Sequence, residues 1–323
     1  MKAVICTRYG PPEFLEIRDI PTPVPKDNEV LIRIHAASLN PLDWRLMRGD
    51  PFLVRLFFGL FKPKHEIIGS DFAGRVEAVG KDANQFHLGD QVFGAKGFVG
   101  GAFAEYVCAL ETEITAKPDN IPFEEAAGVP VAAITALQGL RDKGRIKPGQ
   151  KVLVDGASGG VGTFGIQIAK SYGTEVTAVC STRNLEIARS IGADHVIDYT
   201  RENFTRSGQL YDLIFAANAR HSTFDYYRAL NRGGICVKAG AKPSLSGALE
   251  DLILGPLLSA IGNKKSCSFL AKVSTKDLIV LKDLLAAGKI TSVIDRTYPL
   301  SDVADAIRYL EEGHAQGKVI LTV

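Results

Sequence analysis

The chain has 323 residues, a length typical of two domains rather than one. With 46% hydrophobic and 23% charged residues, the composition is typical of a soluble globular protein. The formal net charge is only +2 and no dense basic run is present, so we expect no nucleic-acid partner.

The sequence contains no run of about 18 uncharged apolar residues, the length that a membrane-spanning helix needs. The two most apolar segments, residues 52–61 and 252–261, are shorter and contain Arg55 and Pro256. The first residues lack the apolar core of a secretory signal. We therefore expect neither a membrane span nor a secretory signal.

Cysteine usage indicates a compartment and excludes one kind of metal site. The five cysteines are far apart in the sequence and form no CxxC pair. A structural zinc site of four cysteines needs such close pairs, so that site is excluded. Dispersed cysteines are typical of free thiols in a reducing compartment, and we expect a cytoplasmic protein.

The first third of the chain predicts a β-rich, barrel-like domain. Apolar and β-branched segments at residues 30–35, 72–79 and 103–108 are strand candidates, and glycine-rich turns lie at residues 89–101. Short, evenly spaced strands between turns are typical of such a domain.

From about residue 123 the pattern changes to alternating helices and strands. A helical segment at residues 123–140 comes first, and further helices are predicted at residues 161–172 and 184–191. The strand candidates are residues 151–155, 175–180, 195–199, 213–217 and 234–239. This alternation predicts parallel βαβ units in a doubly wound α/β sheet.

The last part of the chain adds two amphipathic helices, at residues 275–287 and 301–312, and a strand at residues 318–323. We expect residues 124–271 to form the doubly wound domain. Residues 1–123 and 272–323 would together form the β-rich domain.

A glycine-rich turn from Asp155 to Gly162 follows the first α/β strand and precedes a helix. In that context, small residues let the backbone approach a dinucleotide pyrophosphate, and N–H groups at the helix start point toward it. Ala157 stands where the strict G-x-G-x-x-G pattern has its first glycine, and a plain turn is the alternative interpretation. The predicted cofactor-binding residues are Ala157, Ser158, Gly159, Gly160, Val161 and Gly162.

The end of the second α/β strand indicates which dinucleotide binds. An NAD-selective site places Asp or Glu there to bind the ribose 2′-hydroxyl. Here the strand ends at Cys180, and Ser181, Thr182 and Arg183 follow. Hydroxyls and an arginine can bind the 2′-phosphate of NADPH, although an ordinary polar cap with a solvated arginine is the alternative. We expect NADPH, bound by Ser181 and Arg183.

Five segments carry a family resemblance: residues 39–44, 69–80, 126–137, 192–199 and 317–319. Together with the glycine-rich turn, they resemble the zinc-free quinone-oxidoreductase branch of the medium-chain dehydrogenase/reductase superfamily over nearly the whole chain. The run CSTRN that ends the second α/β strand is similar to chloroplast-envelope-type quinone and enone reductases and their bacterial relatives. The resemblance implies a GroES-like catalytic domain and a Rossmann domain, with the active site between them.

Zinc alcohol dehydrogenases of this superfamily hold the metal through a cysteine, a histidine and a third ligand. The resemblance aligns these positions with Asn40, Ser70 and Val131, none of which has a zinc-binding side chain. His65 precedes a glutamate as the zinc histidine does, but it lies five positions too early, and we expect a loop histidine. We therefore expect no metal.

The resemblance also implies roles for side chains in the active site. Asn40 and Arg45 would point into the site and Thr135 would lie beside the nicotinamide, so these are the predicted catalytic residues. Arg45 stands where relatives have lysine or tyrosine, and a surface salt bridge is the alternative role for it.

Three further residues are predicted to contact the cofactor: Tyr199, Asn218 and Lys318. Tyr199 would pack on the adenine end, unless it is simply a core or rim tyrosine. The aromatic segment at residues 52–61 is either a core stripe or a pocket wall for an apolar substrate.

Without a metal to polarise an alcohol, alcohol oxidation is not expected. We predict an NADPH-dependent oxidoreductase that passes a hydride to a quinone or to the activated double bond of an α,β-unsaturated carbonyl, a small apolar electrophile. The alternatives are a non-catalytic NADPH-binding sensor or crystallin-like protein and a zinc-type alcohol dehydrogenase. Because relatives are commonly dimers, the resemblance implies a homodimer.

Overall fold

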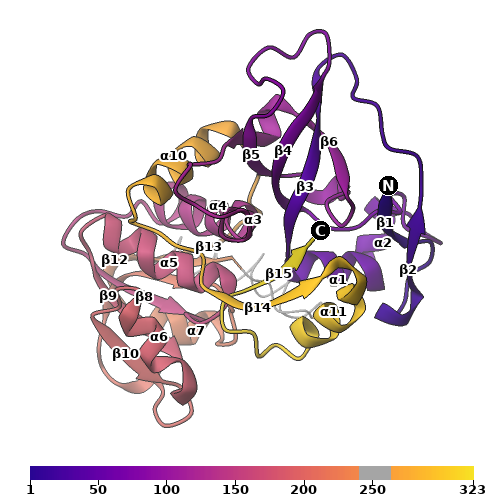
Figure 1. Cartoon of the computed structure of the whole chain (residues 1–323). Helices are drawn as coiled ribbons and strands as arrows, with labels where there is room; N and C mark the ends of the chain where they lie inside the picture. Colours follow the sequence, from indigo (N-terminus) through magenta and orange to yellow (C-terminus); the bar gives the residue numbers. More distant parts are fainter. Residues whose placement is uncertain (240–262) are drawn as a thin grey trace. The chain divides into compact units, whose positions relative to one another are not determined.

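The computed structural model describes residues 1–239 and 263–323, so the apolar segment 252–261 lies outside the described residues. The chain forms two compact units (Figure 1): the first is Met1–Ile134 with Lys272–Val323, and the second is Thr135–Ala271. The division falls within helix α4 (Pro130–Gln138), whereas the sequence pattern changes near residue 123.

The first unit is built on a mixed sheet with the strand order β14-β15-β3-β4-β5-β7, and β6 also pairs with β3. The strands are β3 (Glu29–Leu39), β4 (Asp71–Val79), β5 (Gln91–Ala95), β6 (Tyr106–Leu110), β7 (Ile114–Ala116), β14 (Ile294–Pro299) and β15 (Lys318–Thr322). A separate hairpin joins β1 (Lys2–Cys6) to β2 (Leu15–Asp19). Because β15 runs antiparallel to β3, with Val319 opposite Leu39, the last strand joins the β-rich unit.

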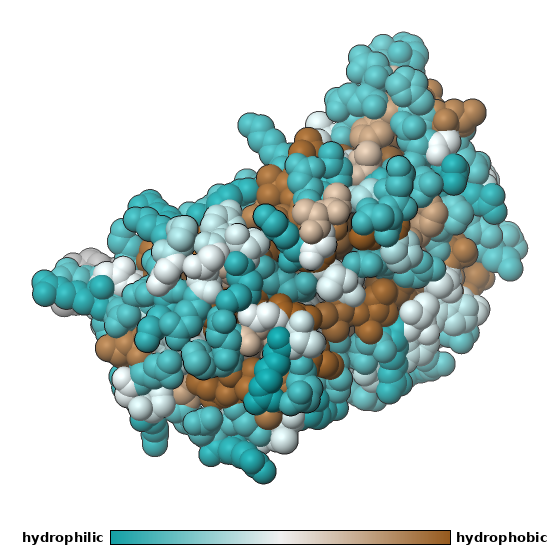
Figure 2. All heavy atoms as spheres, turned by 60° about the vertical axis from the view of Figure 1, so that its left-hand side comes forward, coloured by the Kyte–Doolittle hydropathy of each residue, from teal (hydrophilic) through white to brown (hydrophobic). Residues whose placement is uncertain are grey.

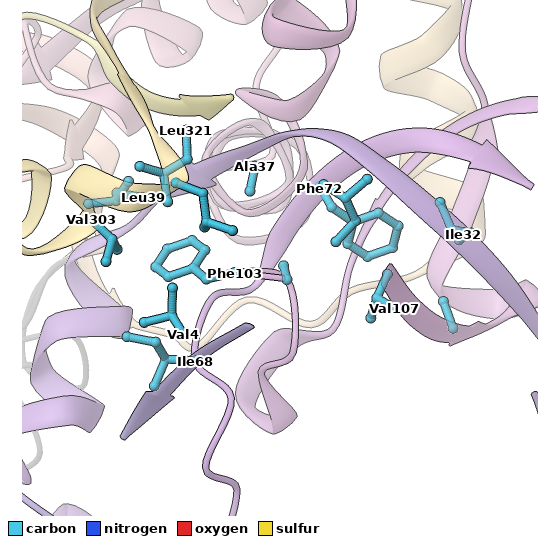
Figure 3. Packing of buried hydrophobic residues seen from close by; sticks show 14 of the residues in the cluster. Val4, Ile32, Ala37, Leu39, Ile68, Phe72, Phe103, Val107, Val303 and Leu321 are labelled. Carbon is cyan, nitrogen blue, oxygen red and sulfur yellow. The ribbon is translucent and has the colours of Figure 1, made fainter. Parts of the chain in front are cut away.

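The core of the first unit lies against this sheet and is shown in Figure 3. The Phe103 ring lies among side chains from distant parts of the chain, including Val4, Leu39 and Val303. These side chains are buried, and the removal of their apolar surface from water stabilises the unit. The C-terminal residues thereby pack against the N-terminal ones.

The second unit is a doubly wound parallel sheet with the strand order β10-β9-β8-β11-β12-β13. Its strands are β8 (Lys151–Asp155), β9 (Glu175–Cys180), β10 (His195–Asp198), β11 (Tyr211–Ala216), β12 (Leu230–Lys238) and β13 (Lys265–Ser268). Its helices include α5 (Gly160–Ser171), α6 (Leu185–Ser190) and α7 (Thr223–Arg228). This order, 3-2-1-4-5-6 in chain order, is that of a Rossmann domain, and ligands of such sheets bind where the order reverses, between β8 and β11. The predicted fold class is confirmed.

The helices of the first unit differ from the sequence pattern in one respect. They are α1 (Pro41–Arg48), α2 (Leu53–Phe58), α3 (Phe123–Ala127), α10 (Thr275–Ala286) and α11 (Val303–Glu311). The helical segment expected over residues 123–140 breaks between α3 and α4, because Pro130 has no N–H to donate to the preceding turn. The sequence predicts only turns over residues 89–101, but the structure has strand β5 there. The strand was missed because the glycines give the segment the composition of a turn.

No helix in residues 1–239 and 263–323 has the length and apolar character that crossing a membrane requires. On the face that Figure 2 shows, hydrophilic residues predominate and apolar residues form separate patches between them.

Candidate functional site

The glycine-rich turn lies in the second unit, at the carboxyl end of β8. Gly156 has a φ of +78°, which a residue with a side chain rarely adopts. Ala157 is buried, and its N–H donates to the Val179 carbonyl on β9 at 3.1 Å. Ser158 and Val161 are half-buried in the same turn. Gly156 therefore makes the sharp turn, which explains why Ala157 can depart from the strict glycine pattern.

Gly162 allows α5 to pack against this turn. A Cβ on Gly162 would lie 2.1 Å from the Gly156 carbonyl oxygen and 2.8 Å from the Ala157 Cα. Side-chain atoms do not approach backbone so closely, so a larger residue would displace the turn. Helix α5 begins at Gly160 with Gly159 as its N-cap, and the first N–H groups of a helix have no partner within it. The result is a backbone cradle that suits a pyrophosphate.

Asn218 borders the turn on the β11 side. Its N–H lies 3.4 Å from the Asp155 carbonyl oxygen, and its Cβ would lie 2.6 Å from a Cβ at Gly156. The buried Asp155 carboxylate accepts a 2.6 Å hydrogen bond from the Tyr226 hydroxyl on α7. Burial raises the pKa of Asp155, and the Tyr226 hydrogen bond opposes that increase. Asp155 therefore fixes the start of the turn, and Asn218 lies beside the cradle.

The residues predicted to bind the 2′-phosphate lie where β9 ends. The Ser181 hydroxyl, which follows Cys180, accepts a hydrogen bond from the Asn184 amide at 3.1 Å. Arg183 lies in the short 3-10 turn that comes next. The Tyr199 N–H donates to the Cys180 carbonyl at 3.1 Å, and the Tyr199 side chain is 51% exposed. Tyr199 is thus a rim residue close to Ser181.

The structure also places a carboxylate at this edge, which the sequence analysis missed. Asp198 ends β10 and accepts hydrogen bonds from the Thr182 and Thr200 hydroxyls. These hydroxyl donors hold the pKa of Asp198 below its ordinary value. The signal available in the sequence was an aspartate at the end of the third α/β strand. Because Asp198 is anionic and near Ser181, it opposes the binding of a phosphate there.

Asn40 belongs to a buried polar network in the first unit. It caps the start of α1 and is 3% exposed. Its Oδ1 accepts a hydrogen bond from Lys318 Nζ at 2.8 Å, and its Nδ2 donates to Asp71 Oδ2 at 2.9 Å. Lys318 Nζ also donates to the Leu39 carbonyl at 3.0 Å and lies 3.6 Å from Asp71 Oδ2. The Ser38 hydroxyl donates to that carboxylate oxygen at 3.0 Å.

Charges in this network are removed from water and depend on one another. Burial raises the pKa of Asp71 and lowers that of Lys318, while the attraction between the two groups opposes both shifts. Lys318 is only 3% exposed and already binds three groups of the first unit. Its contact with the cofactor stays a prediction.

The three residues aligned with zinc ligands lie around Asp71. Asn40 binds its Oδ2, and the Val131 N–H donates to its Oδ1 at 3.1 Å. Ser70 precedes it in the chain, and the buried Ser70 hydroxyl has no hydrogen-bond partner within the described part of the chain. Across residues 1–239 and 263–323, no group of three His, Cys, Asp or Glu side chains could hold a metal ion. The three positions aligned with zinc ligands offer a side-chain amide, a hydroxyl and a backbone N–H, and these groups do not suit zinc.

The other two predicted catalytic residues lie in different units. Arg45 is half-buried on α1, with its guanidinium carbon 5.4 Å from the centre of the Trp44 ring. No carboxylate among the described residues forms an ion pair with Arg45, so the alternative of a salt bridge finds no partner there. Thr135 is half-buried on α4 and is the first residue of the second unit.

Beside α1, the first unit contains a small, largely apolar pocket that is partly open to solvent. Phe58 lines it, with its ring 5.6 Å from that of Phe98. Several large apolar residues of the segment are exposed: Phe52, Leu56, Phe57, Leu60 and Phe61. His65 is an exposed loop residue that also lines the pocket.

Comparison with known proteins gives two family matches. Residues 26–119 match the family described as "Alcohol dehydrogenase GroES-like domain", and residues 191–321 match "Zinc-binding dehydrogenase". The matches lie in the regions that supply the β-rich sheet, the later strands of the parallel sheet and the C-terminal strand.

Individual proteins are similar over nearly the whole chain. The "Chloroplast envelope quinone oxidoreductase homolog" of Arabidopsis thaliana is 35% identical over 95% of this chain and 93% of the relative. The "NADPH-dependent alkenal/one oxidoreductase, chloroplastic" of the same plant is 36% identical, over 99% of this chain and 79% of the relative. The solved structure of the quinone oxidoreductase from Coxiella burnetii has a TM-score of 0.87 and 31% identity, covering 100% of this chain and 99% of that one.

Proposed function

Because the chain belongs to the medium-chain dehydrogenase/reductase superfamily, in its quinone-oxidoreductase-like branch, we propose that it is a zinc-independent, NADPH-dependent reductase of quinones or α,β-unsaturated carbonyl compounds. The observation that carries this proposal is the occupation of the zinc positions by Asn40, Ser70 and Val131. A simple ketone needs a Lewis acid to accept a hydride, whereas a conjugated acceptor spreads the incoming charge onto its own oxygen.

The residues of the second unit fit a nicotinamide dinucleotide. The cradle is formed by Gly156, Gly162 and the start of α5, and a side chain at either glycine would clash with its neighbours. The backbone can therefore approach a pyrophosphate closely, as binding requires. When bound, the cofactor supplies a hydride. The chain itself holds the phosphates and the adenine end, which fixes the direction of the nicotinamide.

In the first unit, Asn40 is suited to stabilising an oxygen that becomes negative. Its amide nitrogen carries two hydrogens, and the bond to Asp71 uses one of them. Lys318 and Asp71 fix the orientation of the amide, so the second N–H is preorganised. The Arg45 guanidinium adds a positive charge on the same helix, and a guanidinium does not supply a proton.

NADPH rather than NADH is our proposal for the cofactor, supported by Ser181 and Arg183 and opposed by the nearby Asp198. Arg183→Ala should weaken NADPH binding by about 1.5–3 kcal/mol and leave NADH binding nearly unchanged, because only NADPH has the 2′-phosphate. Calorimetric titration with both cofactors measures this, and Arg206→Ala, an exposed residue of the same unit, is the matched control. Equal affinities of the parent protein for the two cofactors would contradict the proposal.

The reaction is tested with a panel of acceptors at saturating NADPH. We expect turnover of 1,4-benzoquinone, a naphthoquinone, an enal or an enone, and little turnover of the matching saturated ketone. The alcohol, offered with NADP⁺, should not be oxidised. Elemental analysis of the same sample should find no zinc, and chelation should leave the rate unchanged. Turnover of the ketone and alcohol alone would refute the proposal, and silence on every acceptor with NADPH bound would favour a non-catalytic binding protein.

We also propose that the protein is a homodimer and that it is located in the cytoplasm. The cysteines support a reducing compartment, because none of the five, Cys6, Cys108, Cys180, Cys236 and Cys267, is part of a disulfide. Light scattering of the purified protein and fractionation of cells test the two statements separately.

A further inference from the structure

The pocket beside α1 has one acidic side chain in its wall. The described residues that line it include Asp43, Leu46, Met47, Phe58, Ile68 and Phe98. Most of these are apolar, which suits a flat, weakly polar ring. Among them, Asp43 is the carboxylic acid, and it comes from the first turn of α1.

Asp43 connects this pocket to the buried network around Asn40. The Asn40 N–H donates to Asp43 Oδ2 at 2.7 Å, and Asp43 is 3% exposed. Within residues 1–239 and 263–323, no donor binds the second oxygen, Oδ1. One carboxyl oxygen thus fixes the side chain, and the other is available to carry a proton.

The charges around Asp43 favour its protonated form. Asp71 on β4 opposes a second negative charge, while Lys318 on β15 attracts one. Two carboxylates and one ammonium would leave a buried net charge of −1, so the cluster is neutral when Asp43 is protonated and Asp71 pairs with Lys318. Burial is the largest influence, and it raises the pKa of Asp43 to about 7. Across the pocket, Lys64 and His65 are exposed to water.

We propose that Asp43 is the acid that completes the reduction, by donating its proton to an acceptor bound in this pocket. The inference rests on the proposed reductase function. Hydride addition to a conjugated acceptor displaces a π-electron pair and leaves a negative charge on the acceptor oxygen. That oxygen takes the proton from the Asp43 O–H, which gives the neutral enol or hydroquinone and a carboxylate. NADPH is oxidised to NADP⁺, and water at the open side of the pocket returns a proton to Asp43.

This assignment also defines the substrate class. The acceptor is a planar conjugated carbonyl compound whose ring lies among apolar residues such as Met47, Ile68 and Phe98. Its carbonyl oxygen faces the first turn of α1, because the acid lies there. Tyr9 does not compete for that role, since its hydroxyl already donates to the Gly59 carbonyl at 2.6 Å.

Asp43→Asn is the direct test, because the amide oxygen can still accept the Asn40 N–H bond but the group has no acidic proton. We expect kcat for a naphthoquinone to fall by about 10²–10⁴-fold. The decline of kcat above pH 7 in the parent should also disappear. Asp43→Glu, which keeps an acid, should retain part of kcat and a shifted pH midpoint, and it serves as the second variant if Asp43→Asn does not fold. Asp19→Asn, an exposed aspartate of the same unit, is the matched control and should behave as the parent.

Two measurements do not depend on turnover. Trp44 is the chain's single tryptophan and is adjacent to Asp43, so quenching of its fluorescence by the naphthoquinone reports binding without cofactor. Asp43→Asn should keep this affinity within about threefold, whereas Met47→Phe, which narrows the pocket and leaves Trp44 as the single tryptophan, should weaken the quenching of Trp44. Infrared spectra of the protein alone should show a protonated carboxyl band that titrates near pH 7 in the parent and is missing in Asp43→Asn.

An Asp43→Asn protein with the parent's kcat and pH profile would overturn the assignment of Asp43 alone. So would the absence of a carboxyl band that depends on Asp43, or naphthoquinone binding that Met47→Phe does not affect. A parent protein that reduces no conjugated acceptor would overturn this inference together with the proposed function.

Discussion

Lys318→Met tests whether the buried network holds the first unit together. The side chain is replaced by an apolar one of similar length, so packing is largely kept while the charge is removed. The Leu39 carbonyl and Asn40 Oδ1 then lose their donor, at 3.0 and 2.8 Å respectively. Asp71 loses the ammonium at 3.6 Å and becomes a buried carboxylate without a counter-charge. Removing one partner of a buried ion pair costs about 3–5 kcal/mol, and we expect that loss here.

Urea unfolding followed by Trp44 fluorescence measures this cost in the correct unit, because Trp44 lies in the first unit. The control is Lys81→Met, which breaks an exposed ion pair of 3.0 Å between Lys81 and Asp27, with side chains 70% and 64% exposed. Exposed pairs contribute about 0–1 kcal/mol, so the control should change little.

Asp71→Asn added to Lys318→Met should recover part of the lost stability, because the unpaired buried carboxylate is removed as well. A Lys318→Met protein no less stable than Lys81→Met would refute the reasoning. The network would then be a consequence of the fold rather than a cause of its stability.

Two further predictions concern single positions. Gly162→Ala should destabilise the second unit by about 1–3 kcal/mol and weaken cofactor binding, because its Cβ would lie 2.1 Å from the Gly156 oxygen. Gly159→Ala, with 3.7 Å to the same oxygen, is the control in thermal unfolding and titration, and equal effects would contradict the packing argument. A pKa of Asp43 raised from 3.8 to about 7 means that the folded chain binds a proton which the unfolded chain has lost, so stability falls as pH rises between these values, by up to about 4 kcal/mol. Asp43→Asn should flatten this decline in urea unfolding at pH 5 and pH 8, and parallel curves would show that Asp43 does not titrate in the folded chain.

The local elements could be predicted from the sequence because their signals lie in consecutive residues. The run Lys151–Asp155 has the composition of a buried strand, and the glycine-rich turn after it predicts the start of a helix; the structure has both elements. Proline shows the limit of this approach, since Pro130 divides a segment whose alanine-rich composition predicts one helix. The sequence therefore contained the signal for a helix break, but the alanine-rich composition on both sides of Pro130 favoured the prediction of a single helix.

The contacts of the candidate site depended on the tertiary structure. Lys318 is separated from Asn40 by most of the chain, and only the antiparallel pairing of β15 with β3 brings its ammonium to the Asn40 amide. The sequence indicated that Lys318 and Asn40 both matter, but it did not show that the two side chains contact each other. Buried charges must be compensated by whichever groups the fold brings within a few ångströms. Local periodicity does not encode those distances, and so the partners of Asp71 and the acidic wall of the pocket were decided by packing.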